Sequence, residues 1–314
     1  MLYRAKASGS LMLLGEYAVL QGKTGLVAAI DKFISVTLEP RNDDRIFIDS
    51  ALGTLSLNRQ QITLQAPFEF VLATLAIKKL PSGCNIKISS DLPASIGLGS
   101  SAAMTVALLT TLNRWLEKSS NKLKLWQEAL QVMRAVQGSG SGADCAASIF
   151  GGVIAFSNPP FSVTSLKGIS PLAAVYSGKK LTTARAINIV NSRRQQQPTD
   201  YQKIDEQMNE LSIKAVQAID TKNWISLGNL FNSGQELMKT MGVSNGILEN
   251  LIQGLREQPY ILGAKISGSG LGDCVIGVGK LIPNFFPRNE EEKRLGVKQI
   301  PLVITSEGAS FDES

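Results

Sequence analysis

The segment GLGSSAA, residues 97–103, combines small residues with two hydroxyls and stands directly before a long apolar stretch. Such a bare loop exposes backbone N–H groups at the positive end of the following helix, where phosphate is the usual ligand. Ser100 and Ser101 add hydroxyls that can bond to phosphate or coordinate Mg²⁺. On these residues alone, an anion site and a tight turn that packs the helix closely on a sheet are equal alternatives.

Two phosphate-binding motifs can be compared with this loop. Walker A requires G-x-x-x-x-G-K-[ST], and it is excluded because no Lys follows. GLGSSA does match the dinucleotide pattern G-x-G-x-x-A, with Glu117 about twenty residues after Gly97. However, Glu117 falls near the end of the same predicted helix, whereas the ribose-binding acid belongs at the end of the next strand. The pattern therefore supports a nicotinamide oxidoreductase only weakly.

A second candidate for chemistry is Asp144, which follows alternating glycines in VQGSGSGAD at the start of a predicted helix. Asp is a common helix N-cap, and the residues alone favour that structural role. The chain contains no histidine, which excludes Ser-His-Asp hydrolysis, histidine acid–base catalysis and histidine-ligated metal sites. Any proton transfer must use Asp, Glu, Lys, Tyr or Cys.

Composition is typical of a folded intracellular protein. The 314 residues suggest about two domains of roughly 150 residues each, and 44% of them are hydrophobic. Cys84, Cys145 and Cys274 are far apart and odd in number, so we expect reduced thiols in a cytoplasmic protein. We expect no membrane span, because charged residues and glycines interrupt the apolar stretches, and we find no signal-peptide pattern.

The net charge of +6 suits an acidic partner or an anionic small molecule. The densest basic segment, residues 179–194, has no interleaved aromatic residues, so we expect no nucleic-acid binding. Such a patch is most often a solvated surface. The alternative is a substrate role, in which Lys179, Lys180, Arg193 and Arg194 would meet an anionic substrate.

Hydrophobic periodicity predicts alternating strands and helices in the first half of the chain. We expect strands at 10–20, 25–30, 34–40, 45–49, 83–93 and 151–157, and helices at 68–80, after the glycine loop and around Trp126. Residues 158–170 indicate a domain boundary, because they gather prolines, serines and a glycine. For the second half we expect a strand at 172–177, helices at 201–221, 223–240 and 246–257, a hairpin at 261–279 around a glycine-rich loop, a charged surface connection at 287–299 and a last strand at 299–306.

Three segments, in this order along the chain, resemble the GHMP kinases, a superfamily of small-molecule kinases. GEYAVLQGKTGLVAAI (15–30) is similar to their N-terminal substrate segment, PASIGLGSSAA (93–103) to their motif P-x-x-x-G-L-G-S-S-A, and GAKISGSGLGDC (263–274) to their C-terminal glycine loop. GSGSGAD (138–144) also resembles their motif G-x-x-S-G-x-D. Because of this last match, a functional role for Asp144 is now favoured over a purely structural role as a helix N-cap.

The resemblance implies a two-domain α+β fold with a catalytic cleft between the domains. A ribosomal-protein-S5-like α/β domain would cover residues 1–165, and a ferredoxin-like α+β domain would cover residues 166–314. The implied cofactors are ATP and Mg²⁺. The implied partner is a small-molecule substrate rather than nucleic acid or a membrane, with a homodimer as the candidate assembly.

The resemblance also assigns roles to single residues. Asp144 would be the catalytic residue that accepts the hydroxyl proton, and Ser101 would be a metal ligand. The implied ATP-binding residues are Pro93, Gly97, Leu98, Gly99, Ser100, Ser101, Ala102, Gly268, Ser269 and Gly270, and the implied substrate-binding residues are Glu16, Tyr17, Lys23, Thr182 and Thr183.

Two positions depart from the pattern of the superfamily. Where relatives have A-P-G-K near the N-terminus, this chain has ASGS, so that Lys is replaced by Ser10. Lys6, Lys23 or Lys265 could supply the missing cation, and the sequence does not choose among them. The Mg²⁺-binding Glu of mevalonate kinases, eleven residues before the catalytic Asp, is Met133 here. These departures make a catalytically altered nucleotide- or metabolite-binding protein an alternative.

The expected acceptor is mevalonate, phosphorylated to 5-phosphomevalonate in isoprenoid precursor synthesis. The segment 15–30 and the compact length are more similar to the mevalonate kinase branch of the superfamily. Against this, QGSGSGADCAAS and the GDC at 272–274 resemble the phosphomevalonate kinase branch. Phosphomevalonate is therefore the alternative acceptor.

Overall fold

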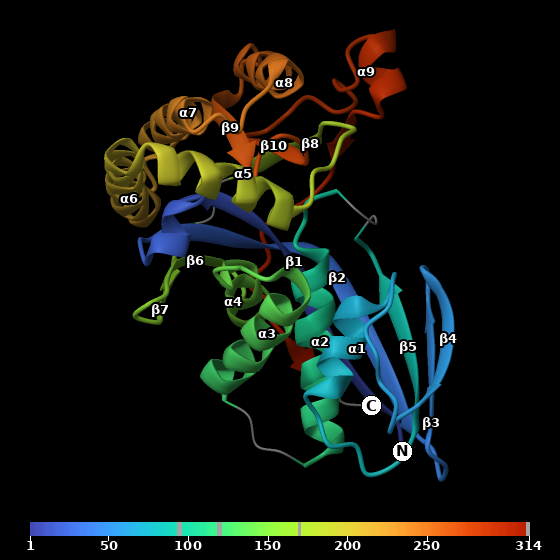
Figure 1. Cartoon of the computed structure of the whole chain (residues 1–314). Coiled ribbons are helices and arrows are strands. Elements are labelled where there is room, and N and C mark those ends of the chain that lie inside the picture. The colour runs from blue at the N-terminus through green and yellow to red at the C-terminus, as the bar shows by residue number, and fades with distance from the viewer. Residues whose placement is uncertain (93–95, 118–120, 169–170, 312–314) are drawn as a thin grey trace.

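The computed structural model describes residues 1–92, 96–117, 121–168 and 171–311, which form two β-sheets with helices packed against each (Figure 1). The larger sheet has the order β12-β1-β2-β5-β3-β4, and β6 and β7 extend it from β2. The strands of this sheet are β1 (Tyr3–Leu14), β2 (Gly25–Pro40), β3 (Arg45–Ser50), β4 (Gly53–Asn58), β5 (Cys84–Ser90), β6 (Val153–Ser157), β7 (Ser162–Leu166) and β12 (Ser310–Phe311).

The described residues of the first half form a short 3-10 helix, η1 (Ala18–Gln21), and four α-helices: α1 (Glu69–Ala76), α2 (Ser100–Trp115), α3 (Lys122–Gln137) and α4 (Ala143–Phe150). Helix α2 lies against β1 and β2 and is surrounded by α1, α3 and α4. Almost all of its side chains from Ala102 to Trp115 are buried, as expected for a helix that is apolar on every face. The glycine loop is thereby attached to the most deeply buried helix of this half.

Strands β1 and β2 form the long antiparallel ladder at the centre of the molecule. Sequence periodicity predicted two strands at 25–30 and 34–40, but the structure has one strand of 16 residues. Ser8 faces Phe33 and Gly9 faces Ile30, so residues 31 and 32 are accommodated in a bulge. A bulge keeps the ladder continuous where the polar residues interrupt the alternation.

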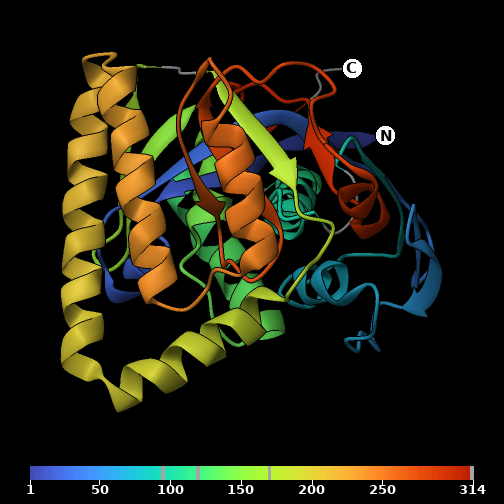
Figure 2. The same ribbon diagram turned by 90° about the horizontal axis from the view of Figure 1, so that it is seen from above.

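The second half builds a four-stranded antiparallel sheet of order β11-β8-β10-β9. Helices α7 and α8 pack on this sheet, and α6 lies beside α7 (Figure 2). The elements are β8 (Leu172–Tyr176), α5 (Thr183–Gln196), α6 (Pro198–Asp220), α7 (Trp224–Thr240), α8 (Gly246–Arg256), β9 (Ile261–Ser267), β10 (Cys274–Gly279), α9 (Glu290–Leu295) and β11 (Lys298–Ile300). The two sheets and their helices agree with the expected α+β class, and the β9–β10 hairpin is found where it was predicted. In the part of the chain that the structure describes, no helix is long and apolar enough to cross a membrane.

Several elements differ from the prediction. The basic segment 179–194 contains helix α5, and the charged connection 287–299 contains α9. Strand β7 lies inside the predicted linker and pairs with β6, so the chain leaves the first sheet only after Leu166. The last predicted strand, 299–306, is divided: β11 pairs with β8, whereas Ile304 bridges to Ile30 of the first sheet. Pro301 explains the division, because it has no N–H to continue the ladder.

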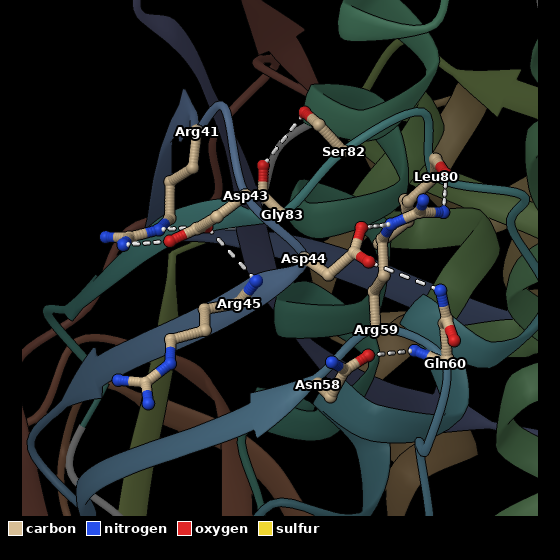
Figure 3. A network of polar contacts seen from close by, with 10 residues as sticks. All are labelled: Arg41, Asp43, Asp44, Arg45, Asn58, Arg59, Gln60, Leu80, Ser82 and Gly83. Carbon is tan, nitrogen blue, oxygen red and sulfur yellow. Dashed lines mark hydrogen bonds and ion pairs between the residues drawn. The ribbon is translucent and has the colours of Figure 1, made fainter.

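A network of polar contacts closes the outer end of the first sheet (Figure 3). Arg59 donates to Asp44 Oδ1 at 2.6 Å and to the Leu80 carbonyl at 2.8 Å. Arg41 donates to both carboxylate oxygens of Asp43, at 2.8 and 2.6 Å, and this pairing lowers the pKa of Asp43 to about 2. The network joins the β3–β4 hairpin to the loop that precedes β5.

Side-chain contacts connect the two sheets at the end of β1. Lys265 of β9 donates to Glu16 Oε1, and both side chains are almost completely excluded from solvent. Ser267 Oγ donates to the Met12 carbonyl at 2.9 Å. Burial lowers the pKa of Lys265, although the Glu16 carboxylate opposes this effect. The ion pair therefore holds β9 against the end of β1 at a position excluded from solvent.

We expect Lys265→Met to destabilise the protein by about 3–5 kcal/mol, because it leaves the Glu16 charge buried without its partner. The free energy of unfolding in urea measures this effect. The matched control is Lys239→Met, since the Lys239–Glu236 pair lies on the surface and surface pairs contribute about 0–1 kcal/mol. Equal losses in the two variants would contradict the importance of the buried pair.

Candidate active site

A cavity of about 330 Å³ lies between the two halves of the chain, and most of the predicted site residues line it. The predicted residues on its wall are Glu16, Tyr17, Gly97, Leu98, Gly99, Ser100, Ser101, Ala102, Asp144, Thr182, Thr183, Gly268 and Ser269. Lys23 and Gly270 are not among the described lining residues, and Pro93 lies outside the part of the chain that the structure describes. The fold thus brings together residues from five separate segments of the sequence.

The glycine loop adopts a backbone that favours glycine. Gly97 and Gly99 have φ values of 74° and 68°, in the left-handed region. Gly99 is the N-cap of α2 and offers no side-chain acceptor, so the first N–H groups of this helix are not capped by a side chain. This is the geometry of a helix N-terminus that can bind phosphate.

Neighbouring side chains explain why the loop has no Cβ atoms at these positions. A Cβ on Gly99 would lie 2.0 Å from Ser10 Oγ, and a Cβ on Gly97 would lie 2.6 Å from the Asp273 Cβ. The glycines therefore leave space for protein side chains as well as for a ligand. The sequence suggested only the space for a ligand.

Asp144 lies in the first turn of α4, whose N-cap is Gly142, so Asp144 is not the capping residue. Its Oδ1 accepts a hydrogen bond of 2.7 Å from Ser10 Oγ. The residue is exposed to the cavity, and within the described part of the chain no hydrogen bond occupies Oδ2. Although Asp144 opens into the cavity, desolvation by the surrounding protein raises its pKa, and the Ser10 hydrogen bond partly offsets this rise. A carboxylate with one fixed oxygen and one open oxygen is suited to accept a proton.

Ser10 connects Asp144 to the glycine loop. Its backbone N–H donates to the Leu98 carbonyl at 3.0 Å, while its hydroxyl donates to Asp144. Met133, the other departure from the family pattern, also lines the cavity. Both unusual residues therefore lie within the site.

The predicted substrate residues Glu16 and Tyr17, between β1 and η1, are held by contacts from the second half of the chain. Glu16 Oε1 accepts from Lys265, and its buried Oε2 has no partner in the described structure. The Tyr17 hydroxyl donates to the Ser269 carbonyl, and burial raises the pKa of Tyr17. The segment 15–17 thus contacts the C-terminal glycine loop, and Glu16 keeps one buried carboxylate oxygen without a partner.

One charged lining residue, Asp273, was not selected from the sequence. Asp273 follows the C-terminal glycine loop directly, and its buried Oδ1 has no hydrogen-bond partner. Burial raises its pKa to about 6, against the lowering effect of the Lys180 charge. Lys180 lines the same cavity. An acid that directly follows a glycine loop is the signal that could have identified Asp273.

Family models and relatives agree with the sequence resemblance. The model described as "GHMP kinases N terminal domain" matches residues 68–152, and the one described as "GHMP kinases C terminal" matches residues 213–292. The chain is 32% identical over 278 residues to the mevalonate kinase of Archaeoglobus fulgidus, covering 88% of this chain and 92% of that protein.

Solved structures have the same fold. The Lin0012 protein from Listeria innocua superimposes with a TM-score of 0.84 at 23% identity, covering 100% of both chains. The Methanococcus jannaschii mevalonate kinase gives a TM-score of 0.76 at 24% identity, covering 97% of this chain and 98% of that one. The overall fold is therefore shared with these proteins.

We expect Ser10→Ala to move the acid limb of the kcat/KM pH profile to higher pH. Asp144 accepts a proton only when it is ionised, so turnover falls as the pH drops through its pKa. The variant removes the hydrogen bond that lowers this pKa and keeps the burial that raises it. Ser8→Ala is the control, because the buried Ser8 hydroxyl on the same strand has no partner in the described structure. An acid limb that stays in place in Ser10→Ala would contradict this role.

We expect Gly99→Ala to reduce both stability and turnover, because the new Cβ meets Ser10 and disturbs its bond to Asp144. Gly138→Ala is the matched control: Gly138 has a φ of 74° but nothing within 4 Å of the added Cβ. Both variants should lose about 1–2 kcal/mol for the left-handed backbone, measured in urea. Only Gly99→Ala should lose activity per folded molecule, and wild-type activity there would refute the proposed contact.

Proposed function

Because this chain belongs to the GHMP kinases, a family of small-molecule kinases, we propose that it transfers the terminal phosphoryl group of ATP to the primary hydroxyl of mevalonate. The observation that supports this proposal best is the meeting of the glycine loop and Asp144 in one cavity, joined by Ser10. The curated relatives that carry the name mevalonate kinase support the choice of acceptor.

The loop 97–101 would bind the phosphates of the nucleotide. Its unpaired N–H groups and the α2 N-terminus provide partial positive charge, and Ser100 and Ser101 add hydroxyl donors at the cavity wall. The C-terminal glycine loop with Gly268 and Ser269 lines the same cavity from the other half. The phosphates would therefore be contacted by both halves of the chain.

Asp144 would receive the proton of the acceptor hydroxyl. The hydroxyl oxygen forms its bond to the terminal phosphorus while the bond from that phosphorus to the bridging oxygen breaks, and ADP leaves with the electron pair. Asp144 Oδ2 takes the proton, and Ser10 keeps the carboxylate oriented through Oδ1. The raised pKa of Asp144 makes it a stronger base than an ordinary exposed carboxylate.

The residues at the loop fit Mg²⁺ together with phosphate. Mg²⁺ usually binds through one or two protein oxygens plus substrate phosphates, and Ser101 and Asp144 provide such oxygens at the cavity wall. The thioether of Met133 is not a ligand that Mg²⁺ selects. No cluster of three or more acids, cysteines or histidines among the described residues could hold a metal without the nucleotide. When bound, the ion would neutralise phosphate charge.

The acceptor would lie against Glu16, Tyr17 and Thr182–Thr183, which line the cavity beside Asp144. Glu16 Oε2 is buried and has no partner among the described residues, so a substrate hydroxyl that reached it would satisfy this oxygen. Lys23 remains a predicted substrate residue although it does not line the cavity. A cytoplasmic location and a homodimer belong to the same proposal, and the three buried free cysteines support the first.

ADP release with ATP and Mg²⁺ tests the proposal when mevalonate and 5-phosphomevalonate are offered side by side. We expect a higher kcat/KM with mevalonate. Asp144→Asn should bind ATP as the wild type does and should lose kcat by about 10² or more, the scale of general-base catalysis.

A higher kcat/KM with 5-phosphomevalonate would reassign the acceptor. ATP binding without turnover of either compound would instead indicate a catalytically altered member of the family. Asp144→Asn with unchanged turnover per folded molecule would remove Asp144 from the mechanism.

A further inference from the structure

The cavity has an unusual charge for a site that binds anions. Its described lining residues include three carboxylates, those of Glu16, Asp144 and Asp273, but a single cationic side chain, Lys180. Lys265, which is buried and does not line the cavity, neutralises Glu16. A nucleotide and an acidic substrate would therefore bind close to the carboxylates of Asp144 and Asp273. Lys180 is the one basic side chain among the described lining residues that could offset the repulsion.

The other candidate cations are occupied or distant. Lys6 pairs with Glu307 at 2.8 Å on the surface. Lys265 is fully buried and donates to Glu16 and to the Ile266 carbonyl. Lys23 does not line the cavity. None of the three residues that could have replaced the missing Lys at position 10 offers its charge to the site.

The arginines of α5 are also occupied. Arg193 donates to the carbonyls of Met241 and Gly242 at 2.8 and 2.9 Å. Arg194 forms an ion pair with Asp205. Lys180, in the loop between β8 and α5, is the remaining basic residue of this segment that reaches the cavity wall.

Contacts with the glycine loops locate Lys180 on the phosphate side of the cavity. The Asp273 N–H donates to the carbonyl of the preceding residue, Lys179, at 2.7 Å. The Asp273 side chain in turn packs on Gly97, where an added Cβ would lie 2.6 Å from the Asp273 Cβ. Lys180 is thus connected through Asp273 to the start of the N-terminal glycine loop.

We propose that Lys180 is the cation that binds the terminal phosphates of the nucleotide, replacing from the second half of the chain the charge that is absent at Ser10. This inference rests on the proposed kinase function. A cation in this place would attract the triphosphate and stabilise the charge that spreads over the phosphoryl oxygens during transfer. Asp273 would act as a positioning residue, because its charge interacts with Lys180 and its side chain contacts the loop.

The test is a direct titration of MgATP and MgADP into Lys180→Met by calorimetry, without an acceptor, followed by steady-state kinetics. We expect ATP affinity to fall about tenfold and ADP affinity to fall less, because the terminal phosphate is missing. We expect kcat to fall about 10- to 100-fold with acceptor KM within about twofold. Lys180→Arg should recover most of the ATP affinity.

Arg185→Met is the matched control, because Arg185 is an exposed basic residue of α5 that does not line the cavity. This variant removes the same charge a short distance away and should keep wild-type affinities. If it weakened ATP binding as much as Lys180→Met, the effect would be general electrostatics and the specific contact would be refuted.

Two results would overturn the inference. Wild-type ATP affinity and kcat in Lys180→Met would show that the phosphates do not need this cation. A higher acceptor KM with unchanged ATP affinity would assign Lys180 to the acceptor instead. Failure of the proposed function is separate: a wild-type protein that turns over no acceptor, with ATP affinity still lost in Lys180→Met, would refute the function and support the contact.

Discussion

The buried ion pair between Glu16 and Lys265 is the constraint on which the cavity depends. The two residues are 249 positions apart in the sequence, and both are hidden from water. A buried pair of this kind adds little net stability, but each charge strongly requires its partner. The pair therefore fixes the end of β1 against β9. The Ser267–Met12 and Tyr17–Ser269 hydrogen bonds lie beside it and hold the two wall segments together.

Within this frame, the replacement of Lys by Ser10 changes the electrostatics of the site. A neutral hydroxyl orients Asp144 but does not stabilise its charge as a cation would, so the carboxylate keeps the raised pKa that burial produces. The base becomes stronger, and the attraction for anions becomes weaker. Helix N-termini and charge from the other half of the chain can restore that attraction. The positions of α2, α5 and Lys180 at one cavity are consistent with this division of roles.

The sequence predicted local features of the fold and the site better than contacts between distant segments. The glycine loop, the following helix and the β9–β10 hairpin depend on short-range backbone preferences, so their patterns could be recognised. The Ser10–Asp144 bond spans 134 residues, and periodicity carries no information about such a contact. The basic segment 179–194 was interpreted as surface, although Ala186, Ile187 and Val190 are buried in α5. Charged residues on its exposed face hid this helical pattern.

The contacts around Gly99 show which effects of residue 10 come from its size and which come from its charge. An alanine at position 10 would remove the Oγ that lies 2.0 Å from the Gly99 Cβ position, but the backbone N and Cβ of residue 10 would still lie only 3.1 and 3.2 Å from it. The close approach of β1 and the left-handed φ of Gly99 therefore favour glycine whichever side chain residue 10 carries, and the Ser10 hydroxyl adds the tightest contact. A Lys at position 10 would place its own Cβ at the same distance from Gly99. The exchange to Ser consequently alters the charge beside Asp144 while the loop keeps its close contact with β1.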